Sequence, residues 1–240
     1  MNRRTRAGAA SLAILLVLAG CGSSGGSDGA GKATTTTAAS GSDAEASYGT
    51  GACAPADGVD EPVLTFEDAP KQCIDLDKTY TATFETSKGD ITVELDTKRT
   101  PVTTNNFVNL ARSGYYDGTD IHRVVESAGF VQGGSPHTQD AADPGPGYTI
   151  PDEGGPYTAE DYVPGILAMA RTNEPNSAGA QFFFLAHDGG TDALASYGTY
   201  AVFGKTTKGL DVLAAMAALD DGTEAPTEQI ILEHVTIEES

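Results

Sequence analysis

The sequence has few basic residues, no tryptophan and only three cysteines. Its 240 residues include 14 Lys and Arg against 34 Asp and Glu, so the formal net charge is −20 at pH 7. Such a chain repels phosphate groups, and we expect no nucleic-acid partner. Hydrophobic residues still make up 39% of the chain, which is enough for the core of one folded domain.

The motifs of several enzyme classes are also missing. The four histidines show no spacing typical of a zinc site, and there is no Cys-x-x-Cys pair or dinucleotide-binding fingerprint. We therefore expect neither a metal nor an organic cofactor. Ser135 and His137 lie close together, but no Gly-x-Ser-x-Gly turn surrounds the serine, so a serine hydrolase is the weakest of the alternatives.

The first twenty residues have the order of an export signal. Three arginines precede an apolar run over residues 7–19, which is too short to span a membrane comfortably. The run ends in Leu18-Ala19-Gly20-Cys21, which resembles the lipobox of bacterial lipoproteins. That resemblance implies cleavage of residues 1–20 and a lipid on Cys21, which would anchor the protein at the extracytoplasmic face of the cell membrane. The alternative is an ordinary secretion signal with an incidental cysteine.

Residues 21–50 are mostly Gly, Ser, Thr and Ala, a composition that predicts a flexible tether. Residues 51–79 form an extension before the main domain and contain Cys53 and Cys73. Two cysteines in an exported chain favour a disulfide over a free thiol or a metal pair. Such a bond stabilises a fold by about 3 kcal/mol, mainly by restricting the unfolded chain.

The pattern of a β-rich domain begins at Tyr80 and continues to residue 240. Alternating apolar residues over 80–95, interrupted by Ser87-Lys88-Gly89-Asp90, predict a hairpin. Thr100-Pro101 predicts the N-cap and first turn of a helix, and a second helix is predicted over 209–219. Short strands are predicted within 121–125, 165–170, 181–185, 200–203 and 230–237. Many short strands with two helices predict an all-β domain, a closed antiparallel barrel with capped ends.

One cationic residue stands out within these strands. Arg123 lies in Ile121-His122-Arg123-Val124-Val125, where strand alternation places it on the same face as Ile121 and Val125. A guanidinium among aliphatic side chains is costly unless it is hydrogen-bonded. Taken alone, the pattern favours a structural ion pair over a functional role.

A series of short motifs resembles the cyclophilin-type peptidyl-prolyl cis-trans isomerases. They extend over residues 80–237 in the order found in that family. The motifs are Gly114-Tyr115-Tyr116-Asp117-Gly118, His122-Arg123-Val124, Gln132-Gly133-Gly134, Gly145-Pro146-Gly147-Tyr148, Asp152-Glu153, Gly165-Ile166-Leu167-Ala168-Met169-Ala170, Gly179-Ala180-Gln181-Phe182-Phe183 and Val202-Phe203-Gly204-Lys205. The resemblance implies an eight-stranded closed antiparallel β-barrel capped by two α-helices.

The resemblance also implies a function and a site. The expected activity is non-covalent acceleration of X-Pro isomerisation in exported proteins, with Arg123 as the catalytic residue and a monomeric enzyme binding proline-containing segments. Gln132 is expected to orient the guanidinium and contact the substrate. The other residues expected at the substrate site are His122, Phe130 or Val131, Met169, Ala170, Gln181, Phe183, Leu194 and Tyr200.

Some positions depart from the family pattern. Seven residues separate Val124 from Gln132, one more than is common, so either Phe130 or Val131 is expected in the proline pocket. The altered loop keeps an alternative open: a weakly catalytic or inactive module that binds proline-containing peptides as a chaperone or assembly partner.

The absence of tryptophan generates a prediction about inhibition. Many relatives engage cyclosporin with a tryptophan, whereas Ala193 lies nearest that place here and Tyr200 stands where animal relatives have histidine. We expect cyclosporin to inhibit this protein more weakly than those relatives, which a titration of isomerase activity measures. Inhibition at nanomolar cyclosporin would contradict this expectation.

Overall fold

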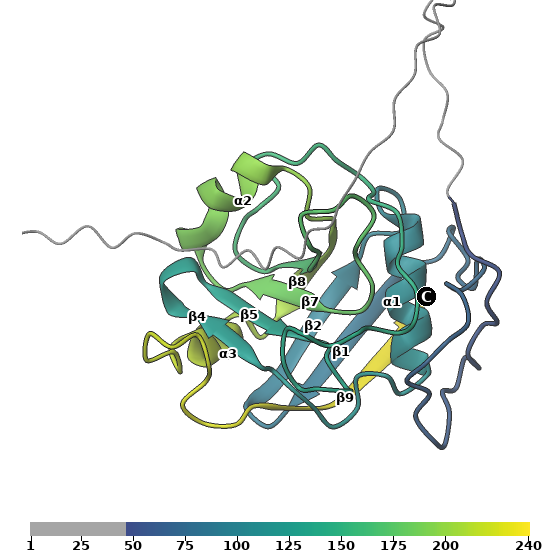
Figure 1. Cartoon of the computed structure of the whole chain (residues 1–240), viewed down its shortest axis with the longest axis horizontal. Helices are drawn as coiled ribbons and strands as arrows, with labels where there is room; N and C mark the ends of the chain where they lie inside the picture. Colours follow the sequence, from purple (N-terminus) through teal and green to yellow (C-terminus); the bar gives the residue numbers. More distant parts are fainter. Residues whose placement is uncertain (1–46) are drawn as a thin grey trace, which may run out of the picture. The chain divides into compact units, whose positions relative to one another are not determined.

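The computed structural model describes residues 47–240 and contains a nine-stranded antiparallel sheet in the order β3-β9-β1-β2-β8-β6-β7-β5-β4. Three α-helices accompany the sheet in this part of the chain (Figure 1). The strands are β1 Tyr80–Thr86, β2 Gly89–Leu95, β3 Thr119–Asp120, β4 Arg123–Val125, β5 Phe130–Gly133, β6 Ile166–Met169, β7 Phe182–Leu185, β8 Val202–Lys208 and β9 Ile231–Glu239. The α-helices are α1 Pro101–Arg112, α2 Thr191–Tyr197 and α3 Leu210–Ala217, and the short 3-10 helices are η1 Glu126–Ala128 and η2 Asp188–Gly190.

The predicted hairpin is present as β1 and β2. Tyr80 pairs with Leu95 at the open end, and Thr86 pairs with Gly89 at the turn. Gly89 has a φ of 124°, a backbone conformation that glycine adopts without steric strain. Every second side chain of β1 is buried, as the alternation in the sequence predicts for a strand with one face on the core.

The predicted barrel differs from the observed sheet in three ways. The sheet has nine strands instead of eight, and β3 and β5 are not among the strands predicted from the sequence. The strand expected over 121–125 is shortened to β4, because Ile121 and His122 lie outside the sheet. The strands β3 and β4 are the opposite edges of the curled sheet and are not paired with each other, so a closed barrel is not confirmed. The helix α2 was not anticipated; with seven residues, it is too short for a clear apolar period.

The inner face of the sheet carries an aromatic core. Phe84 of β1 lies 5.6 Å from Phe107 of α1 and 5.4 Å from Phe182 of β7, measured between ring centroids. Tyr116 stacks on Phe107 at 5.3 Å. Edge-on and offset contacts of this kind stabilise a core beyond the burial of apolar area. The core therefore joins α1 to strands β1 and β7, which lie in different parts of the sheet.

The start of α1 is capped by a side chain from a distant loop. Thr100, the predicted N-cap, makes no side-chain capping bond, and its hydroxyl donates to the carbonyl of Asp96 instead. The two carboxylate oxygens of Glu153 accept hydrogen bonds from the backbone N–H groups of Val102 and Thr103, at 3.0 and 2.9 Å. An anion at this end also interacts favourably with the helix dipole. Glu153 thus supplies the cap that the local sequence was expected to provide.

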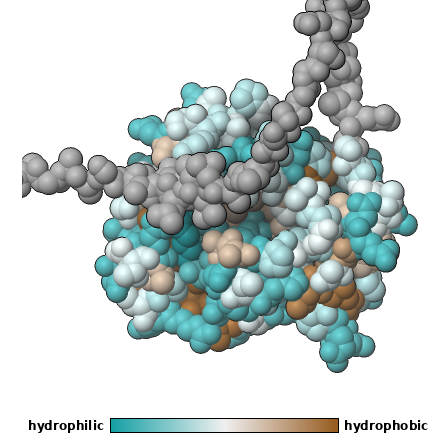
Figure 2. All heavy atoms as spheres, viewed as in Figure 1, coloured by the Kyte–Doolittle hydropathy of each residue, from teal (hydrophilic) through white to brown (hydrophobic). Residues whose placement is uncertain are grey.

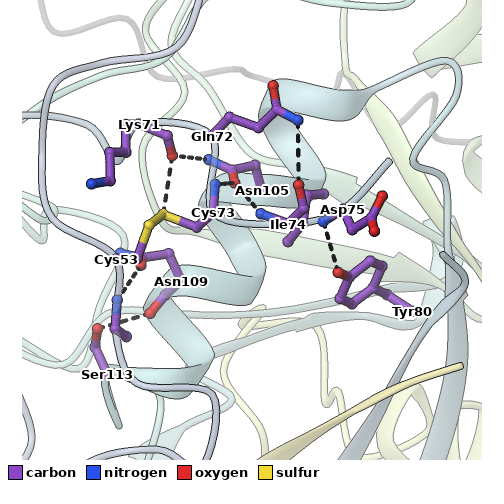
Figure 3. The surroundings of a disulfide bond; sticks show 11 residues. Cys53, Lys71, Gln72, Cys73, Ile74, Asp75, Tyr80, Asn105, Asn109 and Ser113 are labelled. Carbon is purple, nitrogen blue, oxygen red and sulfur yellow. Dashed lines mark hydrogen bonds between the residues drawn. A yellow bond between two sulfur atoms is a disulfide. The ribbon is translucent and has the colours of Figure 1, made fainter. Parts of the chain in front are cut away.

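The extension before β1 lies along α1 (Figure 1) and is closed by the predicted disulfide between Cys53 and Cys73. Asn105 of α1 accepts a hydrogen bond from the N–H of Cys73 at 2.6 Å, and Asn109 accepts one from the N–H of Ala54 at 2.8 Å (Figure 3). Residues 49–51, expected at the end of the tether, already hydrogen-bond to residues 68–71. The folded segment therefore begins slightly earlier than the sequence predicted.

The expected signal peptide, Cys21 and the expected tether up to residue 46 lie outside the described residues. Within residues 47–240 no helix has the length and apolar character needed to cross a membrane. On the face drawn in Figure 2, hydrophilic residues dominate the visible coloured surface, and hydrophobic residues form small separate patches.

The cap on α1 can be tested by removing the carboxylate. We expect Glu153→Ala to lower the free energy of unfolding by about 1–2 kcal/mol, the usual cost of losing a helix cap. Urea unfolding followed by circular dichroism measures the change. Glu160→Ala is the matched control, since the Glu160 side chain is exposed and forms no hydrogen bond within residues 47–240. Equal unfolding curves for the two variants would contradict the proposed cap.

Candidate active site

Three neighbouring strands bring the central predicted residues into one row. Arg123 on β4 pairs in register with Gln132 on β5, and Gln132 pairs with Phe183 on β7. Residues that are directly opposite in antiparallel strands project from the same face of the sheet. The row therefore places a guanidinium, an amide and an aromatic ring side by side.

Arg123 does not share its face with Ile121, as a continuous strand would require. Ile121 and Val124 both belong to the inner core. The break between β3 and β4 changes the alternation, so Arg123 can lie on the outer face while Ile121 points inward. The Arg123 side chain is one-third exposed, with an accessibility of 33%.

Hydrogen bonds fix the polar part of the row. Nε of Arg123 donates to Oε2 of Glu224 at 2.8 Å, and Nη1 donates to Oε1 of Gln132 at 3.2 Å. Nε2 of Gln132 donates to Oε1 of Gln181 at 3.0 Å, and Nε2 of Gln181 donates to the carbonyl of Ala141 at 3.3 Å. The amide of Gln132 thus holds the guanidinium on one side and is itself held on the other.

An apolar notch adjoins the guanidinium; we use this name for Phe130, Phe183, Leu194 and Tyr200. The ring of Phe183 lies 5.5 Å from that of Phe130 and 5.7 Å from that of Tyr200. Leu194, on α2, belongs to the same hydrophobic cluster. The Arg123 guanidinium carbon lies 6.0 Å from the centre of the Phe130 ring. A cation and an apolar surface therefore share one site.

Strand alternation decides which residues face this site. On β7, Phe182 and Phe184 belong to the inner core, whereas Phe183 belongs to the outer cluster. On β5, Phe130 packs in the outer cluster and Val131 is fully buried in the inner core. Of the two residues that the spacing leaves open, Phe130 is the one that faces this site.

Met169 also lies away from the notch. It is 1% exposed and belongs to the inner core, while its neighbours Ala168 and Ala170 belong to the outer cluster. Because successive strand residues project from opposite faces, Met169 and Val131 are corrected here from expected substrate contacts to core residues.

A hollow of about 360 Å³ lies beside Gln132, the residue that holds the guanidinium of Arg123. Three predicted site residues, Gln132, Ala170 and Gln181, line it together with residues of the loop over 141–149. A larger hollow of about 530 Å³, beside β2 and β8, contains no predicted site residue. We call the 360 Å³ hollow beside Gln132, Ala170 and Gln181 the side pocket.

His122 is partly buried beside Arg123, and its ring nitrogens have no hydrogen-bond partner among residues 47–240. Burial lowers the pKa of the imidazole below its ordinary value of 6.5, and the Arg123 charge acts in the same direction, whereas Asp140, Asp143 and Asp120 oppose this shift. The ring is therefore neutral at pH 7 and is not poised as a general acid.

The hydrolase alternative finds no support in this geometry. Ser135 is fully buried, and its hydroxyl has no partner within the described segment. His137 instead interacts with Asp143, with Nδ1 at 3.1 Å from Oδ1. Within residues 47–240 no group of three or more His, Cys, Asp or Glu side chains is placed to hold a metal ion.

Glu224 is the site residue that sequence reasoning missed. It lies 101 positions from Arg123 in a loop after α3. The carbonyl of Glu224 accepts a hydrogen bond from the N–H of Val124 at 3.0 Å, so the loop is attached to β4 next to the arginine. No local motif marks it; the only signal was the need of a strand arginine for an anionic partner.

Comparisons with known proteins agree on one family. The sequence model of the family described as "Cyclophilin type peptidyl-prolyl cis-trans isomerase/CLD" matches residues 81–237. A peptidyl-prolyl cis-trans isomerase of Streptomyces antibioticus is 36% identical over 164 residues, covering 66% of this chain and 95% of that protein. Peptidyl-prolyl cis-trans isomerase B of Escherichia coli is 35% identical over 172 residues, covering 65% of this chain and 99% of that protein.

Solved structures give the same result. A crystal structure of a Cryptosporidium parvum cyclophilin type peptidyl-prolyl cis-trans isomerase has a TM-score of 0.58 and 28% identity, covering 67% of this chain and 98% of that chain. A second structure of that protein, determined in the presence of the dipeptide Ala-Pro, has a TM-score of 0.57 and 29% identity, covering 66% of this chain and 98% of that chain.

The buried imidazole generates a pH prediction. The folded protein holds His122 with a pKa below 6.5, so on acidification the unfolded chain takes up this proton first. The contribution of His122 to stability is present above pH 6.5 and is lost as the pH falls towards the folded pKa. We expect His122→Gln to make the free energy of unfolding less dependent on pH below 6.5, as measured by urea unfolding from pH 8 to pH 5. At pH 8 the imidazole is neutral in the folded and the unfolded protein, so the difference in unfolding free energy there measures only the change in packing. An identical pH dependence in both proteins would contradict the prediction.

Proposed function

The chain belongs to the cyclophilin-type peptidyl-prolyl cis-trans isomerases, and we propose that Arg123 is its catalytic residue. The relatives carry the name of the isomerase activity, and the chain spans nearly the whole length of the first two. Enzymes of this kind act on the peptide bond before proline.

The chemistry of the substrate defines what a catalyst must supply. Rotation about an amide removes its resonance, and the barrier is about 18–20 kcal/mol. In the twisted state the nitrogen regains a lone pair and becomes a hydrogen-bond acceptor. A donor aimed at this nitrogen stabilises the transition state more than either planar ground state, which is the condition for acceleration.

Arg123 meets this requirement. The guanidinium stays charged at all relevant pH values and donates without any proton transfer. Its Nε is bound by Glu224 and its Nη1 by Gln132. Within the described residues no hydrogen bond is formed by Nη2, which leaves this nitrogen available to the substrate. The two partners fix the group in advance, so little order has to be imposed when the peptide binds.

The notch supplies the other half of the site. We propose that the proline ring lies against Phe183, bordered by Phe130, Leu194 and Tyr200. Phe183 and Leu194 are each only 5% exposed, so they form a firm floor. The structure of the parasite relative in the presence of Ala-Pro supports a dipeptide of this type as a minimal ligand. Proline buried here brings its nitrogen next to the arginine.

Glu224 is proposed to tune the charge of the site. An unpaired guanidinium would attract acidic peptides whether or not they contain proline. The Glu224 carboxylate, at 2.8 Å from Nε, offsets this charge on one edge of the group and leaves the other edge free. Because Glu224 is about half exposed, the pair is screened by solvent and its main effect is orientation.

We further propose that the enzyme acts on exported proteins at the extracytoplasmic face of the cell membrane, anchored by a lipid on Cys21. The proposal rests on the export signal and the lipobox-like Leu18-Ala19-Gly20-Cys21. The disulfide between Cys53 and Cys73 supports it, since such bonds persist in oxidising compartments. We propose a monomer that binds proline-containing segments of client proteins and no nucleic acid. Uncatalysed X-Pro isomerisation takes tens to hundreds of seconds, which is slow enough to limit folding.

The observation that carries the mechanism is the shared row of Arg123, Gln132 and Phe183. We expect Arg123→Ala to lower kcat/KM for an Ala-Pro peptide by about 10²–10³, the cost of removing one preorganised donor from an active site. Exchange spectroscopy by NMR measures the rates of cis-trans exchange directly. Arg123→Lys should recover only part of the activity, because an ammonium cannot contact Glu224, Gln132 and substrate in the same plane.

Lys98→Ala is the control for loss of a positive charge. Lys98 is exposed, with a side-chain accessibility of 71%, and lies outside the notch. We expect this variant to retain normal activity. Equal rates for Arg123→Ala and the unmodified protein would remove Arg123 from the mechanism. Binding of the peptide by the unmodified protein without faster exchange would favour the alternative of a binding module.

A further inference from the structure

A segment that precedes the family-matched region reaches the wall of the side pocket. We propose that Phe66 is a positioning residue, through which the extension (residues 47–79) holds the loop over 144–148 in place and so increases affinity for peptide residues that flank the X-Pro bond. The proposal deepens the proposed isomerase function and rests on it. Phe66 lies outside the matched residues 81–237, so this contact is a property of this chain.

Phe66 contacts the loop through both its backbone and its ring. Its N–H donates to the carbonyl of Pro146 at 2.8 Å. Its ring lies edge-on to that of Tyr148, with centroids 6.1 Å apart, and 6.5 Å from the ring of Tyr115. Between these contacts Gly147 has a φ of 99°, and a Cβ there would lie 2.6 Å from the carbonyl oxygen of Phe66. The approach is so close that only glycine fits.

The same loop residues form the side pocket. Pro146, Tyr148 and Gly179 all line it, and Gly179 lies directly beside the other two, since a Cβ there would be 3.3 Å from Pro146. The hydroxyl of Tyr148 donates to Oδ1 of Asn106 at 2.7 Å, and Nδ2 of Asn106 donates to the carbonyl of Gly179 at 2.7 Å. Two neighbouring segments of the pocket wall, at Tyr148 and at Gly179, are therefore fixed to one side chain of α1. A shift of Tyr148 would change the width of the pocket.

The pocket is continuous with the catalytic residues. Gln132 and Gln181 line it, and Gln132 is also the partner of the Arg123 guanidinium. A peptide bound with proline in the notch therefore extends past Gln132 towards the pocket. The X-Pro dipeptide itself ends before the loop, so only longer peptides are expected to contact it.

The extension is anchored firmly enough to hold the loop. The disulfide joins residues 20 positions apart and encloses Phe66 in the closed segment. Both ends of that segment are hydrogen-bonded to α1, Ala54 to Asn109 and Cys73 to Asn105 (Figure 3). Asn106, which holds Tyr148, belongs to the same helix. The disulfide, the helix and the loop thus form one rigid connection to the pocket.

The lining indicates what the pocket accepts. Its charged groups are already engaged: Arg171 binds the carbonyl of Glu174 and lies 3.3 Å from Asp152, and its side chain is only 7% exposed. Asp143 accepts hydrogen bonds from the N–H groups of His137 and Gly145. The remaining lining consists largely of Gly, Ala, Pro, Thr and Ser. We therefore expect small uncharged side chains to bind there.

The test compares short and long substrates on the full-length protein. The probes are a blocked Ala-Pro dipeptide and two blocked peptides in which four alanines precede or follow Ala-Pro. We expect Phe66→Ala to raise KM for at least one long peptide three- to tenfold with kcat unchanged, and to leave kcat/KM for the dipeptide as in the unmodified protein. NMR exchange spectroscopy gives the rates, and chemical-shift titration gives the affinities.

Three further variants keep the result interpretable. Phe66→Tyr keeps the ring and should restore the affinity. Val63→Ala lies in the same disulfide-closed segment, but Val63 is 41% exposed, and this variant should have no effect. The double variant Cys53→Ser, Cys73→Ser loosens the segment and leaves the residues of the loop unchanged. It should weaken the binding of long peptides but not that of the dipeptide.

Two results would overturn the proposal: unchanged affinity for both long peptides in Phe66→Ala, or an equal loss for the dipeptide and the long peptides. If Phe66→Ala does not fold, the cysteine pair decides between the same outcomes. Failure of the proposed function gives a different result, since the unmodified protein would then not accelerate the dipeptide at all.

Discussion

A guanidinium on the face of an apolar sheet is the constraint on which the site depends. Arg123 is tolerated there because two of its nitrogens have partners, Glu224 at Nε and Gln132 at Nη1. Without these partners, the guanidinium would lose part of its hydration without forming hydrogen bonds that compensate for the cost in free energy. The same two contacts set the direction of the remaining donor. The requirement for stability and the requirement of the proposed catalytic mechanism are thus met by one arrangement.

The sheet separates this site from the core by alternation. Three consecutive phenylalanines on β7 illustrate the effect, since Phe182 and Phe184 enter the inner core and Phe183 enters the outer cluster. The inner residues pack against Phe84 and keep the strand in register. The outer residue is then fixed in position by packing behind it. A proline ring bound as proposed would meet a floor that does not need to rearrange.

Local patterns predicted much of this architecture, and long-range contacts account for what they missed. The hairpin and the start of α1 follow from alternation and from Pro101. The family resemblance assigned Phe183 to the site, and strand alternation then placed Phe182 on the opposite face. Spacing left Phe130 and Val131 undecided, because an extra residue before Gln132 shifts the count. Pairing of β5 with β4 and β7 places Phe130 on the same face as Gln132 and Val131 on the other. Glu224 was not predictable, since it lies 101 positions from its partner.

The sequence of helix α1 contains buried polar residues whose hydrogen-bond partners lie in the extension. Asn105, Asn106 and Asn109 are each no more than 2% exposed, which is unusual for amides on a helix. Buried amides without partners cost about 1–3 kcal/mol each. Their partners are found in the extension for Asn105 and Asn109, and in the pocket wall for Asn106. The hydrogen-bonding groups of α1 therefore require both the disulfide-closed segment and the loop that lines the side pocket. Because these asparagine side chains are buried, water cannot replace a lost partner, so a change in the segment or in the loop also affects the other through α1.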